Sequence, residues 1–433
     1  TIQAAVDLAE PNTEIHLNGI FDGSVSIDKA SLTLIGQGPD KTYITANPMQ
    51  VGIRIDGSDV FLKNLSIIGG VQGVAFATGA WKGGLENVSI SGQKGDSGCL
   101  NCEIAETAGL MIVNAAFLTF REVHIANVQG WVQKDGSYGI ANGIRIKQSN
   151  NMIFEDIFIE EVEGIPGGGS VFKSSGPAYG IYLDQSSSNR FEGVGIRSIQ
   201  GGQGQYPSYS GSVGTGIHTY NASTTDYLGI TISNIRGGNA HSPIAGLAAD
   251  ARAIYSAVES ASTYRHILIY DVQGGIKPGN DLPNVGYGLF LSHASNVTFE
   301  NFTVADVETG YGFWSNASNV SIANWIFSNV DYGVWVKNKS VTVNYSLFHQ
   351  IGNKPLSPYA EEGEGVIFEE DPLFAGNTFL LEPESPAVDA GDPESEYCSE
   401  PQANGGRINM GAFGNTPLAT AHPDAVEGND CGE

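Results

Sequence analysis

Charged and titratable side chains recur at two positions of a short strand that the sequence repeats. Arg145 and Lys147 lie on one copy, Asp184 on the next, and His218 and Tyr220 on the copy after that. Together these groups suit removal of a proton beside the carboxylate of a uronic acid. Arg145 or Lys147 would neutralise that carboxylate and stabilise the enolate charge that develops as the proton leaves. His218 or Tyr220 would act as base and acid, oriented by Asp184.

The same groups also have a purely structural interpretation. Charged residues on the outside of a repeat protein are usually solvated, and Lys147 with Asp184 would then form a cross-strand ion pair worth about a few tenths of a kcal/mol. Inverting glycoside hydrolysis needs two carboxylates about 6.5 to 9.5 Å apart. Asp184 has no carboxylate neighbour at these two positions, so the pattern does not indicate that reaction.

Ring side chains continue the first of the two positions along the later copies. They are Tyr182, Tyr255, Phe290, Trp314 and Trp335. Rings stack on the apolar faces of sugars, so a row of them beside a charged cluster is typical of a groove that binds a polysaccharide. The alternative is a protein interface, because exposed rows of Trp and Tyr also mark surfaces that contact a partner or another copy. Trp314 and Trp335 have a third interpretation, which is that the C-terminal tail covers them.

These residues are placed by ten copies of one pattern: Gly, apolar, any, apolar, a polar turn, then alternating apolar residues. The copies begin at Val51, Gln72, Ala108, Asn142, Tyr179, Thr215, Arg252, Tyr287, Tyr311 and Tyr332. Alternation places the apolar residues on one face of each strand. Such a unit cannot bury that face alone and must stack on its own copies, which predicts a parallel β-solenoid with rungs about 4.8 Å apart. The opening Gly suits a tight corner.

Long insertions distinguish six consecutive copies. The step from Gly52 to Gly73 is 21 residues, whereas the step from Gly73 to Gly109 is 36. The next five steps are 34, 37, 36, 37 and 35, with Ala253 in place of the Gly between the last two. The extra residues fall just before the Gly strand, so the six inserts stack along one flank. Insertions on one face of a repeat protein often build its binding face. The alternative is that they are neutral decoration.

The pattern of Gly-apolar-any-apolar, turn and Ser-x-Asn-Val-x-Ile resembles the right-handed parallel β-helix superfamily that includes pectate lyases and polygalacturonases. Residues 1–38 resemble the start of such proteins, and residues 369–393 and 405–414 resemble their closing tail. The resemblance implies an all-β, single-stranded right-handed parallel β-helix of ten or more rungs, with a cleft along one sheet. The triplet Arg145, Ile146 and Lys147 matches part of the polygalacturonase motif, but the rest of that motif is missing, and so is the epimerase motif Asp-Pro-His-Asp.

Three segments are expected from this organisation. Residues 1–47 should form an N-terminal cap with a helix and the first strands, residues 48–352 the β-helix with six corner inserts, and residues 353–433 an irregular C-terminal tail. The tail is too irregular to be another rung. We expect it to cap the end of the rod and protect an open sheet edge.

Charge and cysteine content limit the class of protein. The 433 residues carry a net charge of -26 and no cluster of Lys or Arg, which argues against nucleic acid as a partner, and no apolar run is long enough to span a membrane. Two disulfides are expected among Cys99, Cys102, Cys398 and Cys431, with a zinc site as the weaker alternative. No cofactor is predicted with certainty; the acidic residues leave calcium open, without a location, and no metal-ligand cluster is predicted.

The sequence therefore predicts an extracellular or cell-surface β-helix protein that binds an acidic polysaccharide along one sheet. Proton abstraction by a lyase or epimerase is the reaction that its candidate residues would support. The alternative is a noncatalytic structural or adhesive surface protein that self-associates or binds a partner through the insert wall and the rings.

Overall fold

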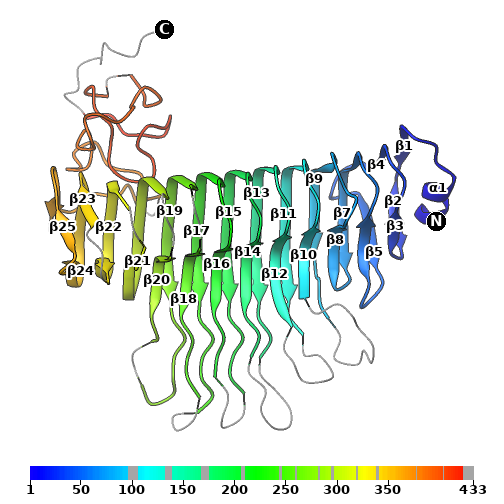
Figure 1. Ribbon diagram of the computed structural model, residues 1–433, viewed down its shortest axis with the longest axis horizontal. Coiled ribbons are helices and arrows are strands. Elements are labelled where there is room, and N and C mark those ends of the chain that lie inside the picture. Colours follow the sequence, from blue (N-terminus) through cyan, green and yellow to red (C-terminus); the bar gives the residue numbers. More distant parts are fainter. Residues whose placement is uncertain are drawn as a thin grey trace.

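The structure is a computed structural model of residues 1–433. It describes residues 1–95, 106–131, 139–166, 175–205, 210–242, 246–258, 261–280, 283–293, 297–317, 320–337, 341–376, 378–402 and 404–422. A single rod of stacked rungs runs from the short helix at the N-terminus to the last strands (Figure 1). All strand pairs between rungs are parallel. The predicted right-handed parallel β-helix is confirmed.

Each central rung has one strand that contains the repeated Gly and one long strand. The Gly strands pair in order and form the sheet called here the Gly-strand sheet. They are β3 (Val25–Ile27), β6 (Val51–Ile55), β8 (Gln72–Phe76), β10 (Glu106–Val113), β12 (Ile140–Lys147), β14 (Ala178–Asp184), β16 (Gly214–Tyr220), β18 (Ala251–Ala257) and β20 (Gly286–Ser292). Strand β18 has Ala253 at the position of the Gly, and β3, at the start of this sheet, has no Gly. The long strands are β7 (Val60–Gly69), β9 (Gly84–Ser91), β11 (Thr119–Gln129), β13 (Ile153–Glu163), β15 (Arg190–Gln200), β17 (Asp226–Arg236) and β19 (Thr263–Gln273).

Toward the C-terminal end the two strands of a rung merge, because the inserts there are short. Strands β21 (Thr298–Ser315) and β22 (Ile322–Val336) each run through both sheets. The first rungs use β1 (Thr13–His16), β2 (Gly19–Asp22), β4 (Leu32–Ile35) and β5 (Thr42–Ala46), and the last use β23 (Val341–Asn344), β24 (Leu347–Leu356), β25 (Ala360–Glu362) and β26 (Ile367–Phe368).

The interior of the rod is filled by apolar side chains that stack from rung to rung. Alternation along each strand sends Ile, Val, Leu and Phe inward, and most of them are fully buried. Inward rings follow one another along the long strands with centroids 4.3 to 5.3 Å apart from Phe120 through Phe299. This continuous column fixes the register of neighbouring rungs, because a slip of one residue would turn every ring outward.

The repeated Gly has a role different from the one the sequence suggested. Gly180 lies inside β14, and a Cβ placed there would be 2.6 Å from the carbonyl oxygen of Gly216 and 2.6 Å from Cγ2 of Ile196. Its φ angle is not among the positive ones. The Gly is therefore needed for close packing between rungs rather than for a corner turn.

The two ends of the chain differ in how they cover the rod. Helix α1 (Ile2–Leu8) buries Ile2 and Val6 at the first rungs, as expected for a capping helix. The expected boundary at residue 353 is too early, because β24 runs through it and β26 still pairs with β24. No helix in the described part of the chain is long and apolar enough to cross a bilayer.

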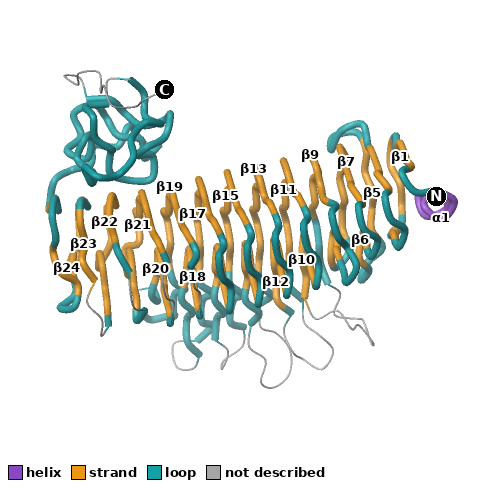
Figure 2. The backbone as a smooth tube through the Cα atoms, turned by 45° about the horizontal axis from the view of Figure 1, so that its top comes forward, coloured by secondary structure: helices purple, strands orange, loops and turns teal. Residues whose placement is uncertain are grey.

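The described part of the C-terminal tail does not lie over the end of the rod. Its described residues from 369 onward pack against the side of the last rungs, as the folded-back segment in Figure 2 shows. Met410, Leu381 and Val388 form a small cluster with Ile326 and Leu347. Ala412 donates its backbone N–H to Oγ1 of Thr303, 3.0 Å away. The prediction that the tail caps the end of the rod is thus wrong for its described residues, which pack on the long-strand side instead.

Candidate functional site

The register of the Gly-strand sheet brings the predicted site residues onto one stripe. Strand pairing aligns the first position in the order Met111, Arg145, Tyr182, His218, Tyr255, Phe290, Trp314 and Trp335. It aligns the second position in the order Val113, Lys147, Asp184, Tyr220, Ala257 and Ser292. The predicted neighbours are therefore neighbours in space, whereas the roles predicted for them remain predictions.

Ring side chains form a continuous row along the first position. The centroid of Tyr182 lies 4.4 Å from that of His218, which lies 4.8 Å from that of Tyr255. Phe290 follows at 5.2 Å from Tyr255, and Trp314 stacks on Phe290 at 4.2 Å with an angle of 19° between the planes. These five residues are called the ring ladder below. All five are half-buried, so each presents part of its ring to solvent.

Trp335 extends the stripe by one rung beyond the ring ladder. It pairs in register with Trp314 and is half-buried in the same way. The tail packs on the long-strand side, against Ile326 and Thr303, rather than on these two indoles. The described part of the tail therefore does not cover Trp314 and Trp335, which was one interpretation of these residues in the sequence.

A further column on the same face was missed at the level of the sequence. It consists of the residues just before the repeated Gly, namely Tyr179, Thr215, Arg252, Tyr287, Tyr311 and Tyr332. The ring of Tyr179 lies 4.9 Å from Tyr182 and 5.1 Å from His218. Strict alternation predicts that residues three apart face opposite sides, which is why this column was overlooked. The repeated dipeptide Tyr-Gly was the signal that could have revealed it.

A buried ion-pair cluster lies where the ring ladder begins. Nε of Arg145 is 3.0 Å from Oε2 of Glu106, and its Nη2 is 3.2 Å from Oδ2 of Asp184. The guanidinium also lies flat against Tyr182, with its carbon 3.8 Å from the ring centroid. Arg145 is only 4% exposed. Asp184 therefore does have a carboxylate neighbour, Glu106, which the sequence pattern did not reveal because it follows a long insert.

This setting bears on the role predicted for Arg145. A guanidinium that two carboxylates and a ring already surround has little free surface with which to meet a substrate carboxylate. Lys147, in contrast, is exposed and forms no ion pair with any described residue. The expected pair between Lys147 and Asp184 is replaced by the pair between Arg145 and Asp184. Lys147 is thus the cation on this part of the stripe that a ligand can reach.

The environment of His218 determines its protonation. Burial between Tyr182 and Tyr255, together with the positive charges of Arg252 and Arg145, lowers the pKa of His218 to about 3. The imidazole is therefore uncharged at neutral pH and has a low affinity for a proton. Burial likewise raises the pKa of Tyr182, although the charge of Arg145 opposes that shift. With so low a pKa, His218 is a weak base for the role predicted from the sequence. Tyr220, the other residue predicted as acid or base, is 43% exposed on the same stripe, and its role remains a prediction.

A second ion pair supports the middle of the ring ladder. Nη2 of Arg252 is 3.5 Å from Oδ2 of Asp250, and Asn284 donates to the other oxygen of that carboxylate at 2.7 Å. The guanidinium carbon of Arg252 lies 4.7 Å from the centroid of Tyr255 and 5.2 Å from that of Phe290. Cation–π contacts of this kind hold both rings in place.

A shallow depression continues the stripe beyond the ion-pair cluster. Its volume is about 440 Å³, and it lies over small side chains, Ala75 and Ala77, with Glu106, Arg145 and Lys147 along its border. Ring ladder, ion-pair cluster and depression thus form one surface on successive rungs. The described parts of the inserts leave the sheet along one edge of this surface.

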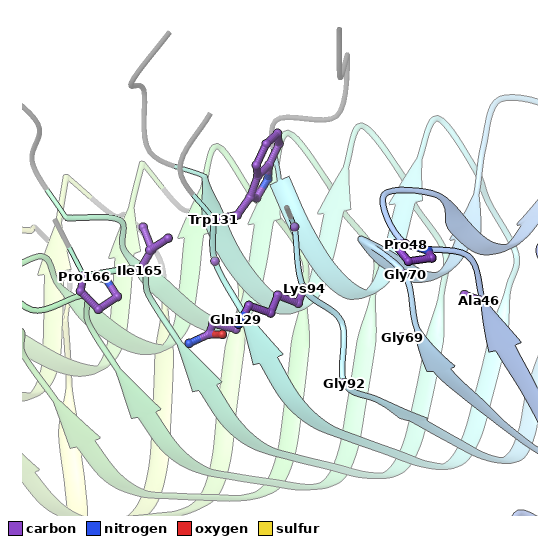
Figure 3. Close-up of a pocket in the computed structure, with 12 residues that line it drawn as sticks. Ala46, Pro48, Gly69, Gly70, Gly92, Lys94, Gln129, Trp131, Ile165 and Pro166 are labelled. Carbon is purple, nitrogen blue, oxygen red and sulfur yellow. The ribbon is translucent and has the colours of Figure 1, made fainter. Parts of the chain in front are cut away.

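A larger hollow of about 660 Å³ lies where the first inserts leave the long strands. Figure 3 shows Lys94 and Gln129 near its centre with Trp131 above them, Ile165 and Pro166 on one side and Pro48 on the other. None of the predicted site residues lines it.

Two other predictions concern the disulfides and a metal site. Cys99, Cys102 and Cys431 lie outside the described residues, and only Cys398 lies within them, so the disulfides stay a prediction. Within the described ranges no group of three or more His, Cys, Asp or Glu side chains could hold a metal ion.

Comparisons with known proteins found similar solved structures but no family. No protein-family model and no curated protein matches the sequence. Similar solved structures include the pectate lyase Pel9A, with 15% identity, 95% of this chain and 90% of that chain covered, and a TM-score of 0.48. ORF18 of Geobacillus virus E2 has 10% identity, coverages of 86% and 58%, and a TM-score of 0.41. The catalytic domain of a GH87 α-1,3-glucanase in complex with nigerose has 13% identity, coverages of 81% and 62%, and a TM-score of 0.38.

These likenesses concern the fold alone. The chain spans 58% of the length of the viral protein and 62% of the length of the glucanase. A function for this chain therefore has to be inferred from the geometry of the stripe.

Proposed function

We propose that the outward face of the Gly-strand sheet binds a polysaccharide chain that lies along the rod axis. The observation that carries the proposal is the ring ladder, in which half-buried rings follow one another at centroid distances of 4.2 to 5.2 Å. Neighbouring rings cover part of one another's faces, as Phe290 and Trp314 do, and together they form a continuous apolar row with one ring on every rung. A polymer that runs along the rod can pack the apolar faces of its sugars on such a row.

The charges on the stripe favour a polymer that carries some negative charge. The Arg side chains of the stripe are paired, as Arg54 is with Asp56 at 2.8 Å, Arg145 with two carboxylates and Arg252 with Asp250. The stripe is thus nearly neutral within a chain of net charge -26, and exposed Lys147 adds a positive group beside the depression. An acidic polysaccharide is repelled least at this surface.

The location and the reaction are separate parts of the proposal. A protein that binds a polysaccharide of a wall, matrix or capsule acts outside the cell, so we propose an extracellular or cell-surface location. The geometry supports binding better than proton abstraction, because Arg145 is engaged by Glu106 and Asp184 and the pKa of His218 is about 3.

Affinity electrophoresis in gels containing alginate, pectate, a glycosaminoglycan or a neutral glucan tests the proposal. At least one polymer should retard the native protein, and the double variant Tyr255→Ala, Phe290→Ala should lose most of that retardation. Loss of two stacking contacts of about 0.5 to 1.5 kcal/mol each predicts roughly 5-fold to 150-fold weaker binding. Trp81→Ala is the matched control, because Trp81 is 51% exposed and lies outside the stripe.

Two results would overturn the proposal. One is equal retardation of the native protein and the double variant, which would place the binding surface elsewhere. The other is no retardation by any polymer together with filaments or sheets of native protein under the electron microscope. That pair of results would favour the structural and adhesive alternative.

A further inference from the structure

The C-terminal tail contains a buried carboxylate with one oxygen left unsatisfied. Glu400 is only 7% exposed. Its Oε1 accepts the backbone N–H groups of Asn409 at 2.9 Å and Asn415 at 2.8 Å. Its Oε2 is buried as well and has no hydrogen-bond partner. A buried carboxylate oxygen without a partner is costly, and it calls for a ligand.

Asp389, which is hydrogen-bonded to Asn409, also has a buried carboxylate oxygen without a partner. The backbone N–H of Asp389 donates to Oδ1 of Asn409 at 2.7 Å, so both acidic residues are fastened to one asparagine. Oδ1 of Asp389 is buried and has no hydrogen-bond partner. The negative charge of Asp389 is also one of the causes that raise the pKa of Glu400, after burial.

The positive groups nearby do not satisfy these two oxygens. Arg407 donates instead to main-chain carbonyl oxygens, from Nη2 to that of Ala390 at 3.1 Å and from Nε to that of Gly391 at 2.5 Å. Burial raises the pKa of Glu400 to about 7 and that of Asp389 to about 6, although the charges of His422 and Arg407 lower the latter. Both carboxylates therefore lie in surroundings that disfavour their negative charge.

We infer that a divalent cation with a preference for oxygen ligands, of the Ca²⁺ type, binds between Asp389 and Glu400. The side-chain ligands are Oδ1 of Asp389 and Oε2 of Glu400, and main-chain carbonyl oxygens and water complete the coordination, as is usual for Ca²⁺. With only two carboxylates the site is expected to be weak, in the range of about 0.1 to 1 mM that is typical of extracellular modules. This inference does not depend on the proposed polysaccharide binding.

The position of the site gives the cation a structural effect. Asn409 joins the two carboxylates and also accepts a hydrogen bond at its carbonyl oxygen from Nδ2 of Asn301, on β21, at 3.4 Å. Its neighbour Met410 is buried against Ile326 of β22. A cation at this point would therefore strengthen the attachment of the tail to the side of the rod.

Thermal unfolding of the full chain with calcium tests the inference. Protein treated with EDTA and dialysed at pH 8 is titrated with CaCl₂, and NaCl of matched ionic strength is the reference. The native protein should gain several degrees in Tm with half-saturation at about 0.1 to 1 mM, and isothermal titration calorimetry should show one bound ion. Glu400→Gln should lose the calcium-dependent gain, whereas Glu384→Gln, at an exposed tail carboxylate, should keep it.

A second variant keeps the inference testable if Glu400→Gln does not fold. Asp389→Asn removes one ligand and leaves the hydrogen bonds of Glu400 in place, and it should weaken calcium binding at least 10-fold. The inference is overturned if calcium raises the Tm of the native protein no more than NaCl does. It is also overturned if folded variants at both positions keep the full response. Polysaccharide is absent from these measurements, so their outcome is independent of the binding proposal.

Discussion

Replacement of His218 by Phe should change how stability depends on pH. The imidazole lies between the rings of Tyr182 and Tyr255, and its pKa is lowered from 6.5 to about 3 by burial and by two nearby Arg charges. Between these two values the unfolded chain binds a proton at this residue and the folded chain does not. Stability therefore falls on acidification, with a limiting slope of about 1.4 kcal/mol per pH unit.

The expected size of the effect is set by the two pKa values. Acidification from pH 6.5 to pH 4.5 should cost the native protein roughly 2 kcal/mol through His218 alone. A Phe side chain fills nearly the same space, keeps the contacts with Tyr182 and Tyr255, and cannot bind a proton. His218→Phe should therefore lose this part of the pH dependence, whereas all other titrating groups contribute equally to both proteins.

Urea unfolding at pH 4.5, 5.5 and 6.5 measures the difference. The free-energy difference between His218→Phe and the native protein should shift in favour of the variant by roughly 2 kcal/mol from pH 6.5 to pH 4.5. His16→Phe is the control, because the side chain of His16 is 71% exposed at the other end of the rod. Parallel curves for the native protein and His218→Phe would refute the assignment of a low pKa to His218.

Three other predictions concern the same face. Arg145→Met should destabilise the protein by about 3 kcal/mol in chemical denaturation, because it leaves Glu106 and Asp184 without their common counter-charge, and a loss below 1 kcal/mol would contradict the ion-pair cluster. Lys147→Ala should weaken retardation by an acidic polymer and leave retardation by a neutral one unchanged, and equal losses would argue against a charge contact. Gly180→Ala should cost about 1 to 3 kcal/mol, because its Cβ would lie 2.6 Å from the carbonyl oxygen of Gly216, and a neutral result would show that the rungs can move apart.

Enzymatic activity can be checked on the same samples. Absorbance of the unsaturated sugar released by a lyase should not rise when the native protein is incubated with alginate or pectate. The reason is that Arg145 is held by two carboxylates and that His218, with a pKa of about 3, binds a proton weakly. A rise that Lys147→Ala and His218→Ala both abolish would show that the sequence-based reaction is correct.

The rung register could be predicted from sequence because it depends on strict local rules. Side chains alternate along a strand, and a repeated Gly marks the same point of every rung, so Arg145, Tyr182 and His218 had to be neighbours. The choice among competing ion-pair partners could not be predicted in this way. Asp184 could pair with Lys147 or Arg145, and only the positions of the side chains decide for Arg145.

Irregular segments account for the other differences between the predictions from the sequence and the structure. Glu106 follows an insert of variable length, so the repeat gave no indication that β10 begins with it. The column that contains Tyr179 and Arg252 breaks the alternation at the close-packed Gly. The tail has no periodicity, and its packing on Ile326 rests on single apolar contacts that a sequence pattern does not record.

The ion pairs and the ring ladder act as one unit in the proposed binding face. The guanidinium of Arg145 lies against the ring of Tyr182, and that of Arg252 lies near the rings of Tyr255 and Phe290. The carboxylates of Glu106 and Asp250 hold these two guanidinium groups in position. Rings that are fixed before a ligand arrives lose little conformational entropy when it binds. The charged residues on this stripe thus serve binding even if no substrate charge contacts them, which reconciles a buried Arg145 with a sugar-binding surface.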